Sequence, residues 1–459
     1  MVQTSVALPG SPARTGPLTP ATGGSGGPWP LTARLVTPGP AGRSGVISVG
    51  GVPLRQIAAE YGTPAYVMDE ADVRQQCRAY RAAFPGGEVA YAAKAFLCRA
   101  MARWADEEDL ALDVCSAGEL SAAASVGFPP ERLILHGNAK TPDDLRAAFG
   151  YRVGRIVIDG VAEIPRLAAQ APGRQQVLLR VTPGIDAHTH AALATGIEDQ
   201  KFGVSLAGGA AAEAVRRIVA QPSLELVGLH CHIGSQITDP DAYVRAARRL
   251  IGLMAAIREE HGLTLSQLNL GGGHGVAYGY DDAGMDLVAL GGCLRAAVRD
   301  ACAALRLPVP RLTVEPGRAI AARAGVTVYR VITIKQRPSG RVFVAVDGGM
   351  SDNPRPALYG ASYTIGAVGQ AAGGAARAVT VTGRHCEAGD ILARDVMLPA
   401  ALRPGDLLVA ACTGAYHHSM ASSYNMVGRP PVIAVRNGSA RVLVRRETDA
   451  DLRRRDVGL

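Results

Sequence analysis

Between residues 88 and 318 the chain repeats one pattern eight times, and this repetition constrains the fold more than any other feature. Short apolar runs alternate with stretches of helical periodicity, such as residues 240–262. The runs span residues 88–94, 110–116, 132–138, 155–160, 176–184, 224–235, 265–273 and 311–318. Continuous apolar runs are typical of parallel strands that are buried on both faces. We therefore predict an α/β fold whose strands close into a (β/α)8 TIM barrel over residues 63–325.

The segments outside the barrel have different patterns. From residue 326 to 459 apolar and polar residues alternate, which predicts a C-terminal antiparallel β domain ending in a hairpin through Asn437 and Gly438. Residues 46–62 are predicted to join this domain through their first strand. Residues 1–45 are rich in Gly, Pro, Ser and Thr and cannot bury enough apolar surface, so we predict that they form a disordered tail.

Charge and composition argue against several classes of protein. The formal charge of +8 is spread along the chain as single arginines, without the basic face that nucleic-acid binding requires, so an anionic cofactor or substrate fits it better. The eight cysteines form no CxxC pair, which indicates neither a disulfide framework nor a structural zinc. No apolar run approaches the roughly 18 residues of a membrane-spanning helix. We expect a cytoplasmic protein without a membrane or nucleic-acid partner.

Lysine is rare in this chain, so few residues are candidates for a reactive side-chain amine. Only four of the 48 basic residues are lysines. Lys201 lies in a loop-like segment, and Lys335 lies in an alternating strand where a solvent-facing lysine is ordinary. Lys94 and Lys140 remain, and Lys94 ends the first apolar run. A lysine at the carboxyl end of a barrel strand can hold an aldehyde cofactor as a Schiff base.

The other predicted strands also end in polar residues. Buried polar groups at this density are costly unless they serve a site, and barrel enzymes place their sites at the carboxyl ends of the strands. These residues are Asp113, Ser116, Glu119, His136, Asn138, Asp159, Arg180, His230, His232, Glu315 and Arg318.

A glycine-rich loop follows the seventh predicted strand. Its backbone N–H groups at 271–275 could converge on a phosphate, and in barrels the loops after strands seven and eight often do so. The eighth strand delivers Arg318 to the same region. A phosphate site beside a strand-end lysine suggests pyridoxal 5'-phosphate (PLP). Glu315 could then keep a pyridine nitrogen protonated, or it could be a buried partner of Arg318.

Two histidine pairs leave a metal enzyme open as an alternative. His230 and His232 are two residues apart on a predicted strand, so both point to one face, as metal ligands in a barrel metallohydrolase can. His188 and His190 repeat the spacing, but a solvated loop is favoured there. The phosphate-type loops give a metal no clear role, so we expect no metal site. Cys386 lies outside the barrel, where a lone cysteine is more often a small buried hydrophobe than a reactive group.

Nine motifs between residues 46 and 450 resemble, in the same order, those of the fold-type III PLP-dependent decarboxylases, and among these the bacterial diaminopimelate decarboxylase family. They are YAAKAF, DVCSAGEL, HGNAK, HIGSQ, LGGGHG, EPGR, DGGMSDNPRPALYG, CEAGD, and GAY followed by SSYNMVGRP. The resemblance implies a barrel with a C-terminal β domain and a head-to-tail homodimer whose sites are shared between subunits.

The same resemblance implies a role for each matching residue. Lys94 would hold the cofactor covalently, His232 would stack on its ring, and Glu315 would meet its pyridine nitrogen. The remaining cofactor-binding residues would be Ser235, Gly271, Gly272, Gly273, Arg318 and Tyr416. Substrate-binding residues would be Arg318, Arg355, Tyr359, Glu387 and Tyr416. Cys386 would reprotonate the α-carbon from the neighbouring subunit.

The implied reaction is decarboxylation of meso-2,6-diaminopimelate to L-lysine and carbon dioxide, the last step of lysine biosynthesis. Two arginines and a tyrosine would hold the distal carboxylate of this substrate, and a glutamate would hold its ammonium group. The chain departs from the family pattern at Ala139, His417 and His418. These departures leave open a paralogue in secondary metabolism that decarboxylates a related amino acid.

Overall fold

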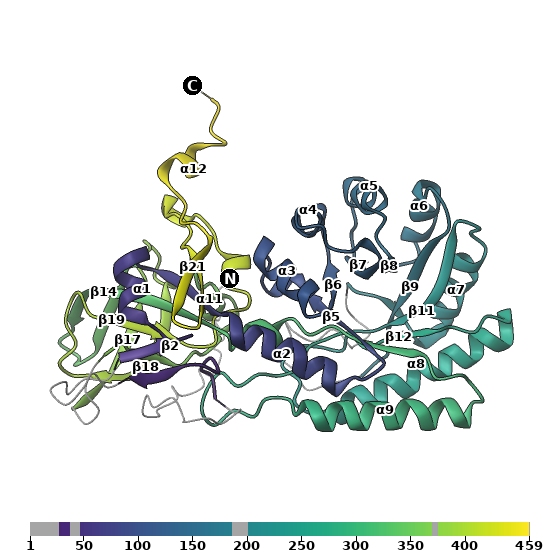
Figure 1. Ribbon diagram of the computed structural model, residues 1–459, viewed down its shortest axis with the longest axis horizontal. Coiled ribbons are helices and arrows are strands. Elements are labelled where there is room, and N and C mark those ends of the chain that lie inside the picture. Colours follow the sequence, from purple (N-terminus) through teal and green to yellow (C-terminus); the bar gives the residue numbers. More distant parts are fainter. Residues whose placement is uncertain (1–26, 37–45, 186–200, 370–374, 459) are drawn as a thin grey trace, which may run out of the picture. The chain divides into compact units, whose positions relative to one another are not determined.

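The computed structural model describes residues 27–36, 46–185, 201–369 and 375–458 (Figure 1). It divides into two compact units. The barrel unit comprises Val73–Val276 and Ala283–Ala322. The β unit comprises the described residues up to Asp72 together with Ala277–Asp282 and those from Arg323 onward. Within the described ranges, no helix combines the length and the apolar character that crossing a membrane requires.

Eight parallel strands close the barrel, as the eight apolar runs predict. Each strand pairs with the next, and the eighth pairs with the first, so the sheet has no gap. In barrel order the strands are β5 (Glu88–Ala92), β6 (Ala111–Val114), β7 (Leu133–Leu135), β8 (Arg155–Ile158), β9 (Gln175–Thr182), β11 (Leu224–His230), β12 (Gln267–Asn269) and β13 (Arg311–Val314). A short strand, β10 (Val204–Ser205), adds to β9. Small and branched side chains fill the interior, namely Ala90, Ala111, Ile134, Val157, Leu178 and Val227.

Helices surround these strands (Figure 1). They are α2 (Glu70–Ala83), α3 (Arg99–Glu107), α4 (Ala117–Ala124), α5 (Pro142–Tyr151), α6 (Glu163–Gln170), α7 (Ala210–Val219), α8 (Pro240–His261), α9 (Leu287–Ala304) and α10 (Arg318–Ala321). Several begin at side chains that accept hydrogen bonds from otherwise unpaired backbone N–H groups. Thr141 and Asp144 form a capping box at α5, and Asp286 accepts from two N–H groups at the start of α9.

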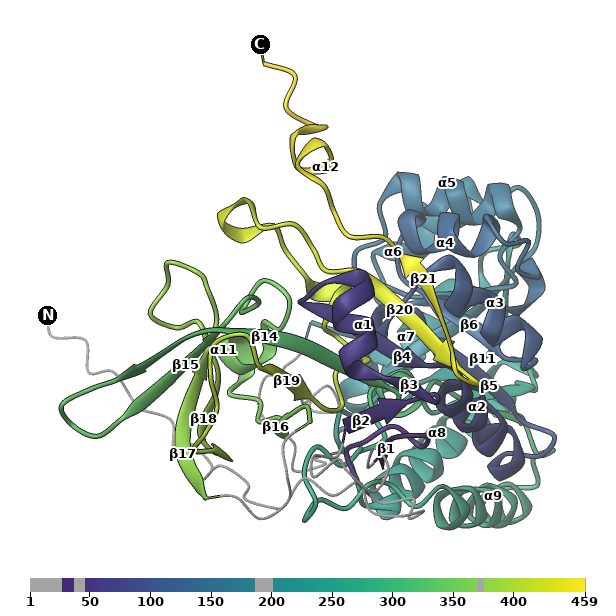
Figure 2. The same ribbon diagram turned by 60° about the vertical axis from the view of Figure 1, so that its left-hand side comes forward.

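The β unit is built around a nine-stranded sheet that is mostly antiparallel (Figure 2). Its strands are β4 (Ala65–Asp69), β14 (Gly325–Gln336), β15 (Val342–Val346), β16 (Ile365–Ala367), β17 (Ala376–Thr382), β18 (Ile391–Pro399), β19 (Leu407–Ala410), β20 (Val432–Arg436) and β21 (Ser439–Val444). Two pairings, β15 with β17 and β4 with β20, are parallel. The final hairpin turns at Asn437 and Gly438, which both have positive φ angles, as such a turn needs. Two short helices, α1 (Leu54–Tyr61) and α11 (Arg355–Tyr359), also belong to this unit, and α12 (Asp449–Arg453) follows β21.

The amino-terminal part of the chain differs from the sequence-based prediction in three places. Within the predicted tail, β1 (Arg34–Val36) pairs with β2 (Val46–Val49), and Trp29 is buried with its Nε1 donating to Tyr280 Oη at 2.7 Å. The rest of that tail, residues 1–26 and 37–45, lies outside the described residues.

The second difference is that β2 pairs with β1 and with β3 (Val52–Pro53), not with the strands of the later domain. Third, β4, which we had assigned to the barrel, pairs with β14 and β20, so the units divide after Asp72 rather than after residue 62. The pairings of β4 join segments that are hundreds of residues apart, and local composition carries no signal of such contacts.

Candidate functional site

The structure separates the two candidate lysines. Lys94 lies directly after β5, its side chain is about half exposed, and its Nζ is 3.4 Å from Asp113 Oδ2. Lys140 is fully buried, and its Nζ donates to Gly137 O, Val157 O and Glu163 Oε1 at 2.8, 2.5 and 2.7 Å. Burial lowers the pKa of Lys140, although Glu163 opposes this shift. The Lys140 side chain therefore joins the loop after β7 to β8 and α6 through hydrogen bonds. Lys94 instead presents an accessible amine at the carboxyl end of its strand.

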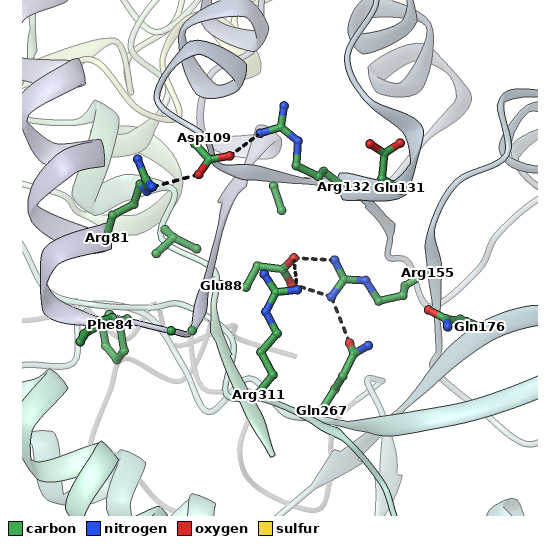
Figure 3. A pocket seen from close by; sticks show the side chains of 15 residues that line it. Arg81, Phe84, Glu88, Asp109, Glu131, Arg132, Arg155, Gln176, Gln267 and Arg311 are labelled. Carbon is green, nitrogen blue, oxygen red and sulfur yellow. Dashed lines mark hydrogen bonds and ion pairs between the residues drawn. The ribbon is translucent and has the colours of Figure 1, made fainter. Parts of the chain in front are cut away.

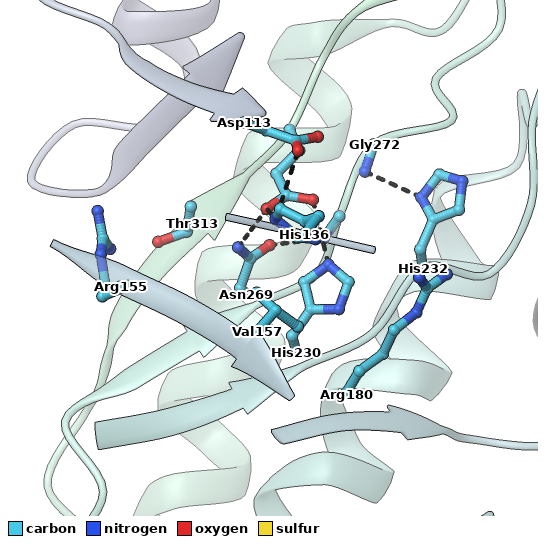
Figure 4. Close-up of polar contacts among 12 residues, drawn as sticks. Asp113, His136, Arg155, Val157, Arg180, His230, His232, Asn269, Gly272 and Thr313 are labelled. Carbon is cyan, nitrogen blue, oxygen red and sulfur yellow. Dashed lines mark hydrogen bonds and ion pairs between the residues drawn. The ribbon is translucent and has the colours of Figure 1, made fainter. Parts of the chain in front are cut away.

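Glu315, directly after β13, is the centre of a buried polar cluster, and its partners His136, His230 and Asn269 are labelled in Figure 4. Asn269 Nδ2 donates to its Oε1 at 2.6 Å, and His136 Nε2 lies 2.9 Å from the same oxygen. His230 Nε2 lies 3.1 Å from Oε2. The contacts of Glu315 are therefore with residues of β7, β11 and β12 and the loops after them. The structure therefore pairs Glu315 with these residues and not with Arg318, which was the alternative partner.

The charge of this cluster resides on Glu315. Burial alone would raise the pKa of the Glu315 carboxyl, but the imidazoles of His136 and His230 hold it well below its usual range. Burial lowers the pKa of His230 to about 4, against the opposing effect of Glu315. At neutral pH His230 is thus a neutral hydrogen-bond donor, and Glu315 is an ionised carboxylate.

His232 lies on the same side of the barrel, two residues beyond His230. Its Nδ1 accepts a hydrogen bond from Gly272 N at 3.3 Å (Figure 4). Burial and the nearby cations Lys94 and Arg180 hold its pKa well below the ordinary value. The ring is therefore neutral, and because Nδ1 accepts, its proton is on Nε2. A neutral, oriented imidazole suits stacking on a flat ring.

The glycine loop after β12 packs too closely for any side chain. Gly271 and Gly273 have φ angles of 66° and 95°, which favour glycine. A Cβ on Gly272 would lie 2.0 Å from Glu315 O, and one on Gly273 would lie 2.0 Å from Gly234 O. The loop is thus fitted between the ends of β11 and β13, with its main chain close to the neighbouring strands.

Arg318 and Ser235 lie beside each other at the same end of the barrel. Arg318 begins α10, is 6% exposed, and donates from Nη2 to Ser235 Oγ at 3.2 Å. Lys94, His232, Ser235, the glycine loop, Glu315 and Arg318 thus all follow barrel strands at their carboxyl ends, and the contacts of Glu315 add Asn269 to the candidates. Asn269 could have been recognised, since it ends a strand directly before the glycine loop. No sequence pattern indicates that His136 lies close to Glu315.

The histidine pair of the alternative metal enzyme does not form as such. His230 contacts Glu315, while His232 accepts from Gly272, so the two rings have different partners. The atoms of His136, His230 and Glu315 that could bind a metal do lie within 4.8 Å of one another. In this structure the same atoms contact each other. His188 and His190 lie outside the described residues.

The β unit holds a second group of predicted residues. Arg355 begins α11, is 6% exposed, and donates from Nε to Tyr363 Oη at 2.8 Å. Its guanidinium lies over the rings of Tyr359 and Tyr416, 5.3 and 5.6 Å from their centroids. In the part of the chain that the structure describes, no carboxylate lies within ion-pair distance of Arg355. A buried arginine without an acidic partner is suited to an external anion.

Cys386 and Glu387 lie in an exposed loop of the same unit. Asp390 holds the loop by accepting from Met350 N and His385 N at 2.7 and 2.8 Å, and Cys386 N donates to Asn425 Oδ1 at 3.2 Å. The alternative interpretation of Cys386 as a small buried hydrophobe is therefore wrong. Its thiol is accessible on a fixed loop.

The three departures from the family pattern have different surroundings. Ala139 is exposed in the loop after β7. His417 is buried and packs edge-on against Tyr363, with ring centroids 5.0 Å apart, so it supports the tyrosine that holds Arg355. His418 packs edge-on against Tyr66 at 6.0 Å, and burial lowers its pKa to about 4.

A hollow of about 420 Å³ lies at the opposite ends of the barrel strands (Figure 3). At its floor Arg155 donates to Glu88 at 2.5 and 2.8 Å and to Gln267 at 3.0 Å, and Arg311 lies 3.4 Å from Glu88. All four residues begin barrel strands. Catalytic sites of barrels lie at the carboxyl ends of the strands. We therefore interpret this ionic cluster as a structural contact that closes the amino-terminal end of the barrel.

Comparisons with known proteins agree with this geometry. Residues 70–322 match the family described as pyridoxal-dependent decarboxylase, pyridoxal binding domain. The diaminopimelate decarboxylase of Actinosynnema pretiosum is 56% identical over 446 residues, covering 96% of this chain and 99% of the relative. That of Mycobacterium tuberculosis is 49% identical over 420 residues, covering 89% and 94%. The solved diaminopimelate decarboxylase of M. jannaschii in complex with L-lysine has a TM-score of 0.86 at 30% identity, covering 93% and 98%.

A closed parallel barrel with a strand-end lysine and a glycine loop defines a barrel enzyme of the pyridoxal-dependent class. The chain belongs to the pyridoxal-dependent decarboxylases and, within them, to the diaminopimelate decarboxylase family. The relatives support neither the metallohydrolase nor the paralogue with a different substrate.

Proposed function

We propose that this chain decarboxylates meso-2,6-diaminopimelate to L-lysine and carbon dioxide as a PLP-dependent carboxy-lyase, the last step of lysine biosynthesis. The observation that carries the proposal is Arg355, a buried guanidinium oriented by one hydrogen bond and two aromatic rings and lacking an acidic partner among the described residues. A substrate with a distal carboxylate supplies that partner. The names of the relatives support the same substrate.

The residues of the barrel unit fit PLP. Lys94 provides an accessible amine for the covalent attachment of the aldehyde. A carboxylate can accept about four hydrogen bonds. Among the described residues, Oε2 of Glu315 has His230 as its one hydrogen-bond partner, so this oxygen can also accept from a pyridine N–H.

The remaining cofactor contacts have matching chemistry. His232 offers a neutral ring for stacking, and the phosphate is assigned to Ser235, the glycine loop 271–273 and Arg318. When bound, PLP would supply a conjugated ring that takes up the electron pair left on the α-carbon as carbon dioxide departs. Glu315 keeps a proton on the pyridine nitrogen during this step, because an ionised carboxylate beside that nitrogen favours its protonated form.

Substrate recognition is assigned to Arg318, Arg355, Tyr359, Glu387 and Tyr416. The Arg355 guanidinium binds the distal carboxylate, and the Glu387 carboxylate binds the distal ammonium group. An amino acid without the distal carboxylate leaves the arginine unpaired. Discrimination of this kind is large, roughly 10⁴-fold where a buried polar group of the site loses its partner.

Cys386 is assigned the final proton transfer. After loss of carbon dioxide, the substrate α-carbon carries an electron pair, and the Cys386 thiol donates its proton to that carbon. The exposed position of Cys386 supports a role toward a neighbouring subunit in a homodimer. The cysteines are all free, which supports a reducing compartment such as the cytoplasm.

Two measurements test the assignment of function. Borohydride reduction of the holoenzyme followed by mass spectrometry should leave the cofactor mass on Lys94, and an unmodified Lys94 would overturn the cofactor assignment. Release of carbon dioxide should be rapid with meso-2,6-diaminopimelate and much slower with D-lysine or D-ornithine, which carry the same reacting end but lack the distal carboxylate. Equal rates with all three would overturn the substrate assignment.

The shared site is tested by mixing two inactive variants. Lys94→Ala and Cys386→Ala subunits, exchanged at equal amounts, form mixed dimers as half of all dimers. If each site takes its lysine from one subunit and its cysteine from the other, mixing restores about a quarter of the wild-type sites. If both residues of a site come from one subunit, mixing restores no activity.

A further inference from the structure

The glycine loop has one N–H group that differs from its neighbours. Gly271 N donates to Asn269 Oδ1 at 2.9 Å, and Gly272 N donates to His232 Nδ1 at 3.3 Å. Among the residues that the structure describes, Gly273 N has no acceptor, and Gly273 is only partly buried. A backbone donor in this state is available to a ligand.

The carbonyl groups of the loop, by contrast, are all bound. Gly271 O accepts from Glu315 N at 2.8 Å, and Gly273 O accepts from Ile237 N at 3.0 Å. Gly272 O accepts from the hydroxyl of Tyr243 at 3.0 Å. Of these three contacts, only the last is made by a side chain.

The Tyr243 contact determines where the Gly273 N–H points. In a trans peptide the C=O of one residue and the N–H of the next point in opposite directions. Tyr243 holds the C=O of Gly272, so the N–H in the same plane, that of Gly273, points away from Tyr243. Glycine has few conformational restraints of its own, so without this bond the peptide plane could rotate.

Tyr243 is itself held in place by buried rings. It is 1% exposed on α8, and its ring packs against His274 with centroids 5.1 Å apart. His274 in turn stacks on Tyr80 of α2, at 5.5 Å with an interplanar angle of 18°, and its Nδ1 is hydrogen-bonded to Tyr80 Oη at 2.8 Å. Burial raises the pKa of Tyr243 well above its ordinary value and lowers that of His274 to about 3. Both side chains are therefore neutral over the whole working pH range.

We infer that Tyr243 is a positioning residue that fixes the Gly272–Gly273 peptide so that its N–H faces the cofactor phosphate. The inference rests on the proposed function, which assigns the phosphate to the glycine loop. Tyr243 does not touch the phosphate in this scheme and acts only through the peptide plane. The stack with His274 and Tyr80 keeps its hydroxyl at the carbonyl.

The test compares two ligands that differ only in the phosphate. Apoenzyme of the wild type and of Tyr243→Phe is titrated with PLP and with pyridoxal, and binding is followed by the absorbance of the attached chromophore. We expect PLP to bind roughly threefold to tenfold more weakly to Tyr243→Phe, the size of one hydrogen bond, and pyridoxal to bind within about twofold of the wild type. Tyr151→Phe is the matched control, because Tyr151 also donates to a main-chain carbonyl, that of Phe128, at 2.8 Å in the same unit.

Each other outcome has a defined meaning. Equal weakening for both ligands, or no change for either, would overturn the role of Tyr243. If the wild type binds PLP no more tightly than pyridoxal, the phosphate assignment itself is wrong, whatever Tyr243 does. Should Tyr243→Phe fail to fold, Tyr80→Phe serves in its place. It loosens the stack without removing the Tyr243 hydroxyl and should weaken PLP binding selectively by about twofold, and no selective change would overturn the inference.

Discussion

Replacing Arg355 by lysine gives the sharpest test of substrate recognition. Lysine retains the positive charge but lacks the planar fork, so it cannot bind a carboxylate with two parallel N–H groups or donate through an Nε atom. Arg355 donates from Nε to Tyr363 at 2.8 Å, and its guanidinium lies over two tyrosine rings. Arg355→Lys therefore changes the geometry of the contact while keeping its charge.

The expected loss can be worked from these contacts. One hydrogen bond between charged groups is worth about 1.5–3 kcal/mol, and the bond that orients Nε is worth about 0.5–1.5 kcal/mol. Together they amount to about 2–4.5 kcal/mol. At 1.4 kcal/mol for each factor of ten, kcat/KM for meso-2,6-diaminopimelate should fall about 30-fold to 1,500-fold.

D-Lysine is the matched substrate. Because the product is L-lysine, carbon dioxide leaves from the D centre of the substrate, and D-lysine has this reacting end but no distal carboxylate. We expect its slow decarboxylation to change by less than about threefold in Arg355→Lys, since it never formed the lost contact. Release of carbon dioxide measures both reactions on the same preparations. An equal loss for both substrates would show that Arg355 supports the reacting centre in general and would refute the proposed recognition of the distal end.

Three further predictions concern the carboxylates and histidines of the barrel unit. Glu315→Gln should lower kcat by roughly 10²–10³-fold with the cofactor still bound, as shown by its colour, because an amide cannot hold a proton on the pyridine nitrogen. The folded-state pKa of His274, about 3, lies below its ordinary value of 6.5. The unfolded chain thus binds the proton first, and the free energy of unfolding should fall as pH falls from about 6.5 toward 3, less steeply in His274→Phe. Glu88→Gln should lower the free energy of unfolding by about 3–5 kcal/mol, measured by urea titration, because it leaves Arg155 buried without its partner. The control Glu213→Gln, which removes a solvent-screened ion pair, should leave the free energy of unfolding nearly unchanged.

The barrel could be predicted from sequence because each of its strands carries a local signal. A strand buried on both faces reads as a continuous apolar run. Seven of the eight runs contain the observed strand, and the eighth, 176–184, starts one residue after β9 begins. The C-terminal antiparallel β domain was also predicted, but two of its strands, β16 and β18, have no clear pattern of their own. β18 alternates exposed and buried residues irregularly over Ile391–Pro399, and β16 has only three residues. Neither presents the clear two-residue period that the prediction relies on.

The positions of the candidate residues could be predicted one by one, but their contacts could not. Position at the end of a strand identified Lys94 and Glu315. Burial then distinguished Lys94 from Lys140, a difference that no sequence pattern contains. The pairing of His230 with His232 followed from spacing along one strand, whereas the observed partner of both His136 and His230 is Glu315, two or more strands away.

The glycine loop is the part of the site whose contacts are hardest to predict from sequence, because main-chain atoms make them. In sequence, Tyr243 and Tyr80 are ordinary apolar positions of helices, and both are fully buried as such positions should be. Their hydroxyl groups nevertheless have specific partners, a carbonyl for Tyr243 and an imidazole for Tyr80. A hydrophobic pattern reports which side of a helix faces the core, but it does not report which buried hydroxyl meets which carbonyl. Since a bound carbonyl fixes the N–H of the next residue, the core packing of α8 sets the direction of a donor in the loop after β12.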